Sequence, residues 1–106
     1  MKKSIRSQVA LAAVLSMAGV AGFAQAGQDT YKAKCQSCHG ATGMADSGAG
    51  KAMKVKPVSD PEVKKMSAAD MIAVTTDGKG KMPAYKGKLT DEQIKAAVEY
   101  YRSLGR

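Results

Sequence analysis

Both cysteines of this chain and its single histidine lie within one five-residue segment, Cys35-Gln36-Ser37-Cys38-His39. A disulfide between cysteines separated by only two residues closes a very small loop, so it would remove little entropy from the unfolded chain. Such a bond could not hold a whole domain together. The usual stabilising role of cysteines in small secreted proteins is therefore excluded here, and the segment calls for a different chemistry.

The N-terminus has the three parts of a secretory signal peptide. A basic start is followed by an apolar run over residues 9–24, and the small residues of Ala24-Gln25-Ala26 suit a cleavage site. We predict that residues 1–26 are a signal peptide cleaved after Ala26, and that residues 27–106 form one periplasmic domain without a membrane span. The alternative is an anchor that stays attached, although the apolar run is short for that role.

The domain expected after cleavage is small and poor in aromatic side chains. The whole chain has 106 residues, too few for a doubly wound or barrel enzyme fold. Its only Phe lies in the signal peptide and it has no Trp, so tyrosines are the only aromatic residues of the mature domain. Domains of this size rarely build a sufficient core without a disulfide, a metal or a cofactor. A bound group that fills the centre is therefore expected.

The Cys-x-x-Cys-His spacing is compatible with three kinds of chemistry. A redox dithiol uses it at a helix start in a fold of strands and helices, but this chain has no convincing strand and the residues before Cys35 look helical. Zinc needs about four ligands, whereas this chain offers only two cysteines and one histidine, all within the same short motif. Covalent haem attachment remains. Two thiols on one helical turn, Cys35 and Cys38, can form thioethers, and His39 is then placed to bind the iron.

A second axial ligand would have to be Met, with Lys or Tyr as the alternatives, because the chain has no other histidine. Met82 is the best candidate, since it lies in the Gly- and Lys-rich stretch over residues 77–85 and Pro83 favours an extended backbone before it. Met53 is the alternative, because residues 51–56 also read as a loop. The other methionines of the domain fit core packing or lie too close to the histidine; they are Met44, Met66 and Met71.

Together these segments resemble class I cytochrome c, the small soluble type with one haem, in its compact bacterial form. The resemblance covers the chain after residue 26. A helix leads into the Cys-x-x-Cys-His motif, Gly78-x-Gly80-x-Met82-Pro83-Ala84-Tyr85 is similar to the methionine loop of the family, and a closing helix ends at Leu104. The resemblance implies an all-α fold in which the N- and C-terminal helices cross over one covalently bound haem.

The resemblance also implies a function and a set of site residues. Cys35 and Cys38 would carry the thioethers of one haem c, and His39 and Met82 would be the axial ligands of its iron. The protein would then be a one-electron carrier between redox partners and not an enzyme. The alternatives are a haem-bearing subunit or sensor module of a larger complex, or a haem peroxidase-like protein if Met82 does not bind the iron.

Two further positions can be compared with the family. Tyr31 takes the place of an aromatic residue at the helix crossing, where Tyr100 and Tyr101 would lie on the other side. Lys51 stands where mitochondrial members have a proline whose neighbouring carbonyl accepts the imidazole N–H. The nearest proline here is Pro57, so the carbonyl that orients the histidine is left open.

Capping residues support the same organisation without the resemblance. The sequence predicts a helix over residues 28–37 and a loop over residues 40–56. Three more helices are marked by their caps: a short one after Asp60, one from Ser67 to Gly78 and one from Thr90 to Gly105. In the last, an apolar stripe at helical spacing predicts core packing; its residues are Ile94, Ala97, Val98, Tyr101 and Leu104.

Basic residues outnumber acidic ones by 17 to 9, and four lysines flank Met82. These are Lys79, Lys81, Lys86 and Lys88. We predict a basic rim that attracts acidic patches on redox protein partners; the alternative is a solvated loop that only keeps the protein soluble. Nucleic acid is not expected as a partner, because the domain is exported and no aromatic residues alternate with the basic ones. The protein is predicted to be a monomer.

Overall fold

The fold consists of helices joined by loops in the computed structural model, which describes residues 22–106. In this part of the chain, extended pairing is limited to two isolated bridges, Lys79 with Met82 and Lys86 with Leu89. The all-α prediction is confirmed. None of the helices described is long and apolar enough to cross a membrane. Most of the expected signal peptide, residues 1–21, lies outside the described residues.

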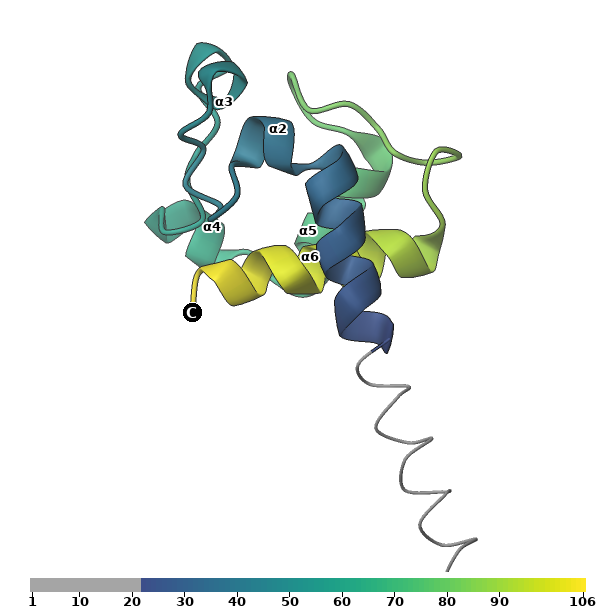
Figure 1. The fold of residues 1–106 in the computed structure, drawn as a ribbon. Coiled ribbons are helices and arrows are strands. Elements are labelled where there is room, and N and C mark those ends of the chain that lie inside the picture. Colours follow the sequence, from purple (N-terminus) through teal and green to yellow (C-terminus); the bar gives the residue numbers. More distant parts are fainter. Residues whose placement is uncertain (1–21) are drawn as a thin grey trace, which may run out of the picture.

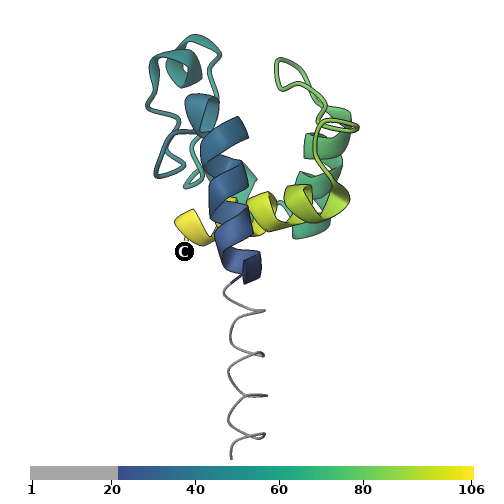
Figure 2. The same ribbon diagram turned by 45° about the vertical axis from the view of Figure 1, so that its right-hand side comes forward.

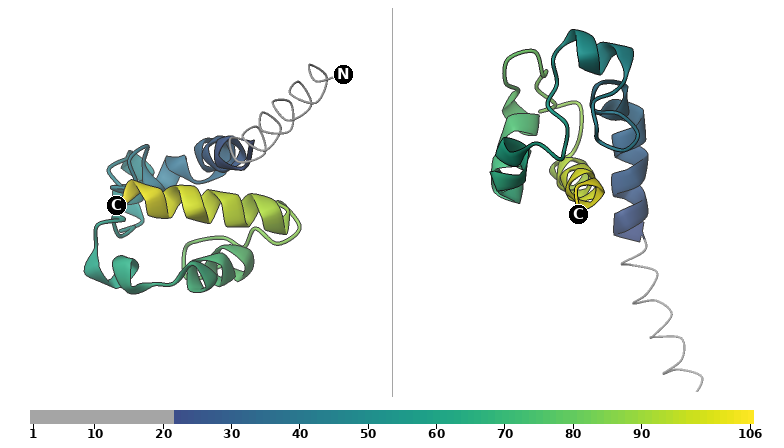
Figure 3. Two further views of the ribbon diagram at one scale, coloured as in Figure 1. Left: turned by 90° about the horizontal axis from the view of Figure 1, so that it is seen from below. Right: turned by 90° about the vertical axis from the view of Figure 1, so that its left-hand side faces the viewer.

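The two ends of the described chain cross each other. The N-terminal helix, residues 22–34, crosses α6 (Asp91–Leu104), which lies between that helix and α5 (Ala68–Asp77) (Figures 1 and 3). Figure 2 gives the same crossing from a second direction. The approach is close because Gly27 has no side chain, and a Cβ there would lie 2.4 Å from the carbonyl oxygen of Ala96. The expected crossing of terminal helices is therefore present.

The N-terminal helix differs from its expected range of residues 28–37. Residues 22–34 are helical, Cys35 forms a turn, and a short helix α2 (Gln36–His39) follows. Cys35 has a φ of −116°, well away from the roughly −63° of a regular α-helix. Its carbonyl nevertheless accepts a hydrogen bond of 3.0 Å from the backbone N–H of His39. The motif therefore starts a new helical turn instead of extending the helix before it.

The loop expected over residues 40–56 contains a helix, so that prediction was wrong in part. Helix α3 spans Gly48–Ala52 and begins at Ser47, whose hydroxyl oxygen accepts from the backbone N–H of Gly50 at 3.0 Å. The same hydroxyl donates to the carbonyl of Ser37 at 2.7 Å, which ties α3 to α2. A helix of five Gly, Ala and Lys residues has no apolar periodicity, which is why the sequence pattern does not reveal it.

The three other helices begin at the capping residues that the sequence indicates. Helix α4 is Pro61–Lys65, with the Asp60 carboxylate accepting from the backbone N–H of Glu62 at 2.8 Å. Helix α5 starts after Ser67 and ends at Gly78. Helix α6 has a complete capping box, because the Thr90 and Gln93 side chains each accept from the other residue's backbone N–H. Local side-chain chemistry sets these boundaries.

The buried core is small. Its central cluster is Met71 of α5 with Ile94 and Val98 of α6. Around this cluster lie apolar side chains that remain half-buried: Val63, Met66, Ile72, Tyr85, Leu89 and Tyr101. Of the predicted stripe on α6, Ile94, Ala97 and Val98 are buried, whereas Tyr101 and Leu104 are half-buried. The apolar side chains around the cluster therefore keep part of their surface uncovered by protein atoms.

Gly50→Ala is expected to destabilise the protein by about 1–3 kcal/mol, because a Cβ there would meet backbone that cannot easily move. It would lie 2.4 Å from the carbonyl oxygen of Cys38 and 2.7 Å from that of Ala45. Gly48→Ala, in the same helix, has open space around its Cβ and should be neutral or slightly stabilising. Urea unfolding of both variants, followed by circular dichroism, tests this. Equal stability of the two would contradict it.

Candidate functional site

The Cys-x-x-Cys-His segment is fixed in place by the helix crossing. Tyr31, 1% exposed, packs against Tyr100 and Tyr101 of α6, with ring centroids 5.1 and 6.2 Å apart. Its hydroxyl donates a hydrogen bond of 2.6 Å to the carbonyl of Gly40, the residue after α2. The predicted position of Tyr31 at the crossing is therefore observed. Through this hydrogen bond the crossing also sets where α2 lies.

The two thiols are half-buried, and Cys35 differs from the reactive cysteine of a redox dithiol. Cys35 precedes α2 and Cys38 lies within it, and both are free. Burial, and to a smaller extent the nearby Cys38, raises the pKa of Cys35 to about 11. Reactive cysteines of dithiol oxidoreductases instead have a lowered pKa, which keeps a thiolate available near neutral pH. The raised pKa of Cys35 therefore argues against a disulfide-exchange role for this thiol.

Burial favours the neutral form of the His39 imidazole. Burial lowers the pKa of His39, because desolvation disfavours the charged ring. Its Nδ1 atom is buried and has no hydrogen-bond partner in the structure. The ring packs edge-on against Tyr101, with centroids 5.2 Å apart and an angle of 67° between the planes. A neutral imidazole beside two thiols is a suitable metal ligand, and the unsatisfied nitrogen indicates that the site is more than core packing.

These residues fit a haem. The thiols and the imidazole of α2 lie in one helical turn, where they can reach the same flat group. The apolar side chains around Met71, Ile94 and Val98 remain half-buried, so an apolar group could pack against them. One large apolar group with a metal at its centre would cover these side chains and would give the imidazole a metal to bind.

Met82 lies in the loop between α5 and α6, and several hydrogen bonds hold this loop in place. The backbone groups of Lys79 and Met82 exchange two hydrogen bonds of 3.0 Å, which form a tight turn. At Gly78, φ is +80° and a Cβ would lie 2.9 Å from the backbone nitrogen of Ala84, so only glycine fits there. The Met82 side chain is half-buried. The loop therefore holds its methionine in a defined place.

Tyr85 connects this loop to the cysteine motif, and its role was not recognised from the sequence. Its backbone N–H donates to the carbonyl of Thr75 on α5, and its hydroxyl donates to the carbonyl of Lys34, both at 3.0 Å. Lys34 directly precedes Cys35. Residues 51 positions apart are thus linked across the site. The only signal in the sequence is an aromatic residue three positions after the methionine.

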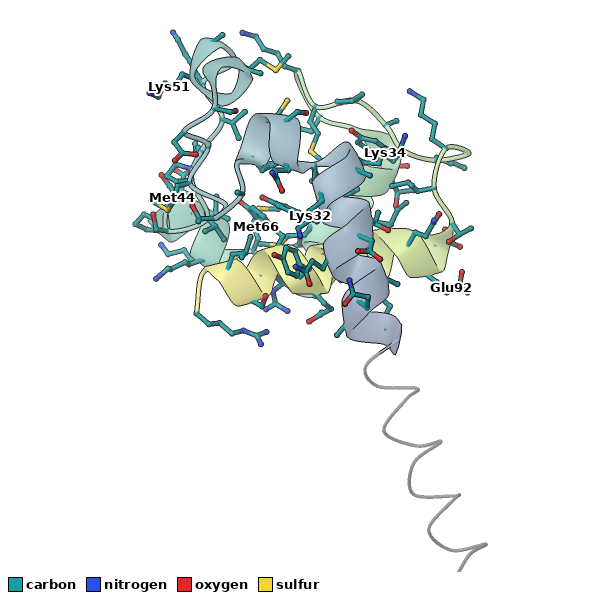
Figure 4. The ribbon with its side chains drawn as sticks, viewed as in Figure 1. Lys32, Lys34, Met44, Lys51, Met66 and Glu92 are labelled. Carbon is teal, nitrogen blue, oxygen red and sulfur yellow. The ribbon has the colours of Figure 1, made fainter. Side chains whose placement is uncertain are left out.

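The other methionines occupy different environments. Met53 is 41% exposed, and its sulfur lies 3.9 Å from that of Cys38, so it borders the site beside one thiol. Met44 is 44% exposed and contacts the Ser59 hydroxyl away from the core (Figure 4). Met71 is buried and Met66 packs against it, in agreement with a core role. Met53 is therefore the only one of these that the structure brings next to the motif.

Similar proteins are cytochromes. The chain matches the family described as "Cytochrome C oxidase, cbb3-type, subunit III" over residues 22–100. Cytochrome c6 of Leptolyngbya boryana is 36% identical over 77 residues, which cover 73% of this chain and 87% of that protein. Cytochrome c-551 of Halorhodospira halochloris is 36% identical over 81 residues, covering 73% and 95%. Cbb3-type cytochrome c oxidase subunit CcoP of Azospirillum is 32% identical over 102 residues, covering 87% and 33%.

Proposed function

Because the chain belongs to the class I cytochrome c family, whose covalently bound c-type haem serves electron transfer, we propose the residues that hold the group. Cys35 and Cys38 form its thioether bonds, and His39 and Met82 are the axial ligands of its iron. When bound, the haem supplies an iron that gains or loses one electron. The protein is a one-electron carrier, and with both axial positions taken by side chains it has no site for a substrate on the metal.

The observation that carries this proposal is the state of His39. The half-buried imidazole, whose neutral form is favoured by burial, lies in the same turn as two thiols, and its buried Nδ1 has no hydrogen-bond partner. A purely structural histidine would normally have hydrogen-bond partners for its buried polar atoms. Tyr31 and Gly40 hold the turn in place from the side of the helix crossing. The chain thus offers a preformed ligand where the motif implies attachment.

The bracing of the Met82 loop supports Met82 over Met53. The turn at Lys79 and the two hydrogen bonds of Tyr85 hold the loop against α5 and the start of the motif. Holding a loop rigidly lowers the entropy cost of keeping a weak iron–sulfur bond. A thioether ligand favours the reduced iron and so raises the reduction potential. Met53 is more exposed and lies against a proposed attachment sulfur.

Met82→Ala should abolish the weak sulfur-to-iron charge-transfer band in the visible spectrum of the oxidised protein and lower its reduction potential, because the iron loses its thioether ligand. Met53→Ala is the matched control and should keep the band. Absorption spectra and redox titrations of the purified variants measure both. A band lost in Met53→Ala but kept in Met82→Ala would contradict the assignment, and a high-spin, five-coordinate wild-type spectrum would favour a peroxidase-like function.

Burial at the N-terminus supports export with cleavage after Ala26. Residues 22–26 are all exposed, including Phe23 at 44%, and Gly27 is the first buried residue of the helix. Cleavage after Ala26 would therefore remove few packing contacts made by residues 22–26. We propose that residues 27–106 act in the periplasm as a monomer. The alternative location is the membrane surface, if the N-terminal segment stays attached as an anchor.

Lysines around the methionine loop support docking to acidic redox partners. Lys79, Lys81, Lys86 and Lys88 are all exposed. Lys34 and Lys51 lie at the same end of the molecule, one from the end of the N-terminal helix and one from α3 (Figure 4). Concentrated positive charge attracts a negatively charged partner over a distance and orients it on approach. The proposed contact face is therefore the end of the molecule that carries the motif and the methionine loop.

Electron transfer to hexacyanoferrate(III), a small anionic oxidant, should slow several-fold as salt is raised from low concentration to about 0.15 M, because ions screen the attraction. The double variant Lys79→Gln, Lys81→Gln should react more slowly and depend less on salt. Its control is Lys64→Gln, Lys65→Gln on α4, which lies away from the loop (Figure 1). Stopped-flow kinetics give the rates. Equal effects of the two double variants, or a rate that rises with salt, would count against this face.

A subunit of a terminal oxidase is the second candidate function. The family description and the CcoP relative both favour it. However, this chain covers 33% of that relative, whereas it covers 87% and 95% of the cytochromes c6 and c-551. The separate carrier is therefore the function that the comparisons support best. Copurification of an oxidase with this protein in low salt would favour the second candidate.

A further inference from the structure

The imidazole of His39 lacks the hydrogen bond that usually orients a metal-binding histidine. Such a histidine almost always donates its second ring N–H to a carbonyl or carboxylate, which fixes the ring plane and raises the basicity of the ligand. In the described part of the chain, Nδ1 of His39 is buried and none of the surrounding groups accepts from it. The ring plane must therefore be set by packing.

Tyr101 is the aromatic residue packed against that ring. The two ring centroids are 5.2 Å apart and the planes meet at 67°, an edge-to-face arrangement that aromatic rings favour. Tyr101 lies on α6, whereas His39 lies on α2, so the contact joins two elements that are distant in sequence. Its half-buried ring also packs against the core cluster of Met71, Ile94 and Val98.

Tyr101 is itself held from a second side. Its ring stacks on Tyr31, with centroids 6.2 Å apart and an angle of 27°. Tyr31 is fully buried and donates its hydroxyl proton to the carbonyl of Gly40, the residue that follows His39. Ring contacts therefore connect His39 to Tyr101 and Tyr101 to Tyr31. The hydrogen bond of Tyr31 then leads back to Gly40, the next residue after His39 in the chain. These contacts link the orientation of the imidazole and of the Tyr101 ring to the helix crossing.

We propose that Tyr101 is a positioning residue that sets the plane of the His39 imidazole by ring contact, in the role that a hydrogen bond to Nδ1 usually has. This proposal rests on the proposed function, in which His39 binds the iron. The hydroxyl of Tyr101 takes no part in this ring contact, so a phenylalanine at this position should orient the imidazole equally well. A histidine oriented in this way also receives no added basicity from an acceptor, which favours the reduced state of the iron.

The test compares four variants of the haem-loaded protein in the oxidised state. The proton NMR shifts of the haem methyl groups depend on the direction of the axial imidazole plane, so their pattern reports the ring orientation directly. Tyr101→Leu and Tyr101→Met remove the ring but keep an apolar side chain, and each should lose the wild-type pattern. Tyr101→Phe should keep it. Two different ring-free variants are used so that poor folding of one does not decide the result.

Tyr100→Leu is the matched control. Tyr100 neighbours Tyr101 on α6 and packs against Tyr31 at 5.1 Å, so its loss weakens the same aromatic cluster. Its ring is not among those packed on His39 in the described residues. Tyr100→Leu should therefore lower the thermal stability while the methyl pattern stays as in wild type. If it changes the pattern as much as Tyr101→Leu does, a general loosening of the crossing explains both and the proposal is wrong.

Two other results overturn the proposal in distinguishable ways. A wild-type pattern in Tyr101→Leu and Tyr101→Met, with the His39 ring protons still strongly shifted by the iron, would leave the proposed function intact and remove only the positioning role. Wild-type spectra in which the His39 ring protons carry no shift from the iron would show that His39 is not a ligand. In that case both proposals fail.

Discussion

One hydrogen bond determines how the cysteine motif sits in the molecule: the bond from the Tyr31 hydroxyl to the Gly40 carbonyl. Both groups are buried, so loss of either partner would leave a polar atom without water or protein to satisfy it. Burial, with smaller contributions from Tyr101, Cys35 and Tyr100, raises the pKa of Tyr31, which keeps its hydroxyl a donor. The close crossing of the terminal helices and the position of α2 are therefore parts of the same arrangement.

The core shows why such a small domain needs a bound group. Its buried cluster is Met71, Ile94 and Val98, and the apolar side chains around it remain half-buried. A chain with neither Phe nor Trp after residue 26 has little else with which to cover them. In our proposal the porphyrin would supply the large apolar surface, and its iron would be bound by His39 from α2 and by Met82 from the loop between α5 and α6. Cofactor binding and completion of the core are then one process.

Features set by local chemistry could be predicted from the sequence. The starts of α4, α5 and α6 follow from the side-chain caps at Asp60, Ser67 and Thr90. The attachment motif is equally local, because its residues are adjacent. Helix α3 was not predicted, because it has no apolar stripe. Its only local sign is the capping residue Ser47.

Features that depend on tertiary contacts could not be read from the sequence. The N-terminal helix gives way to a new turn at Cys35, where Tyr31 and Gly40 fix the motif. The hydrogen bond from Tyr85 to Lys34 joins segments 51 residues apart. The sequence also left open which group orients His39, and the structure offers an aromatic ring where a carbonyl was expected.

The central claim is that a haem bound covalently through Cys35 and Cys38 fills the middle of a domain formed by residues 27–106. The mass of the intact, denatured protein, purified from cells that attach c-type haem, tests it most directly. We expect the mass of residues 27–106 plus one haem, because thioether bonds survive denaturation. The mass of the polypeptide alone would contradict the account, since a haem that leaves on unfolding is not attached through the two cysteines.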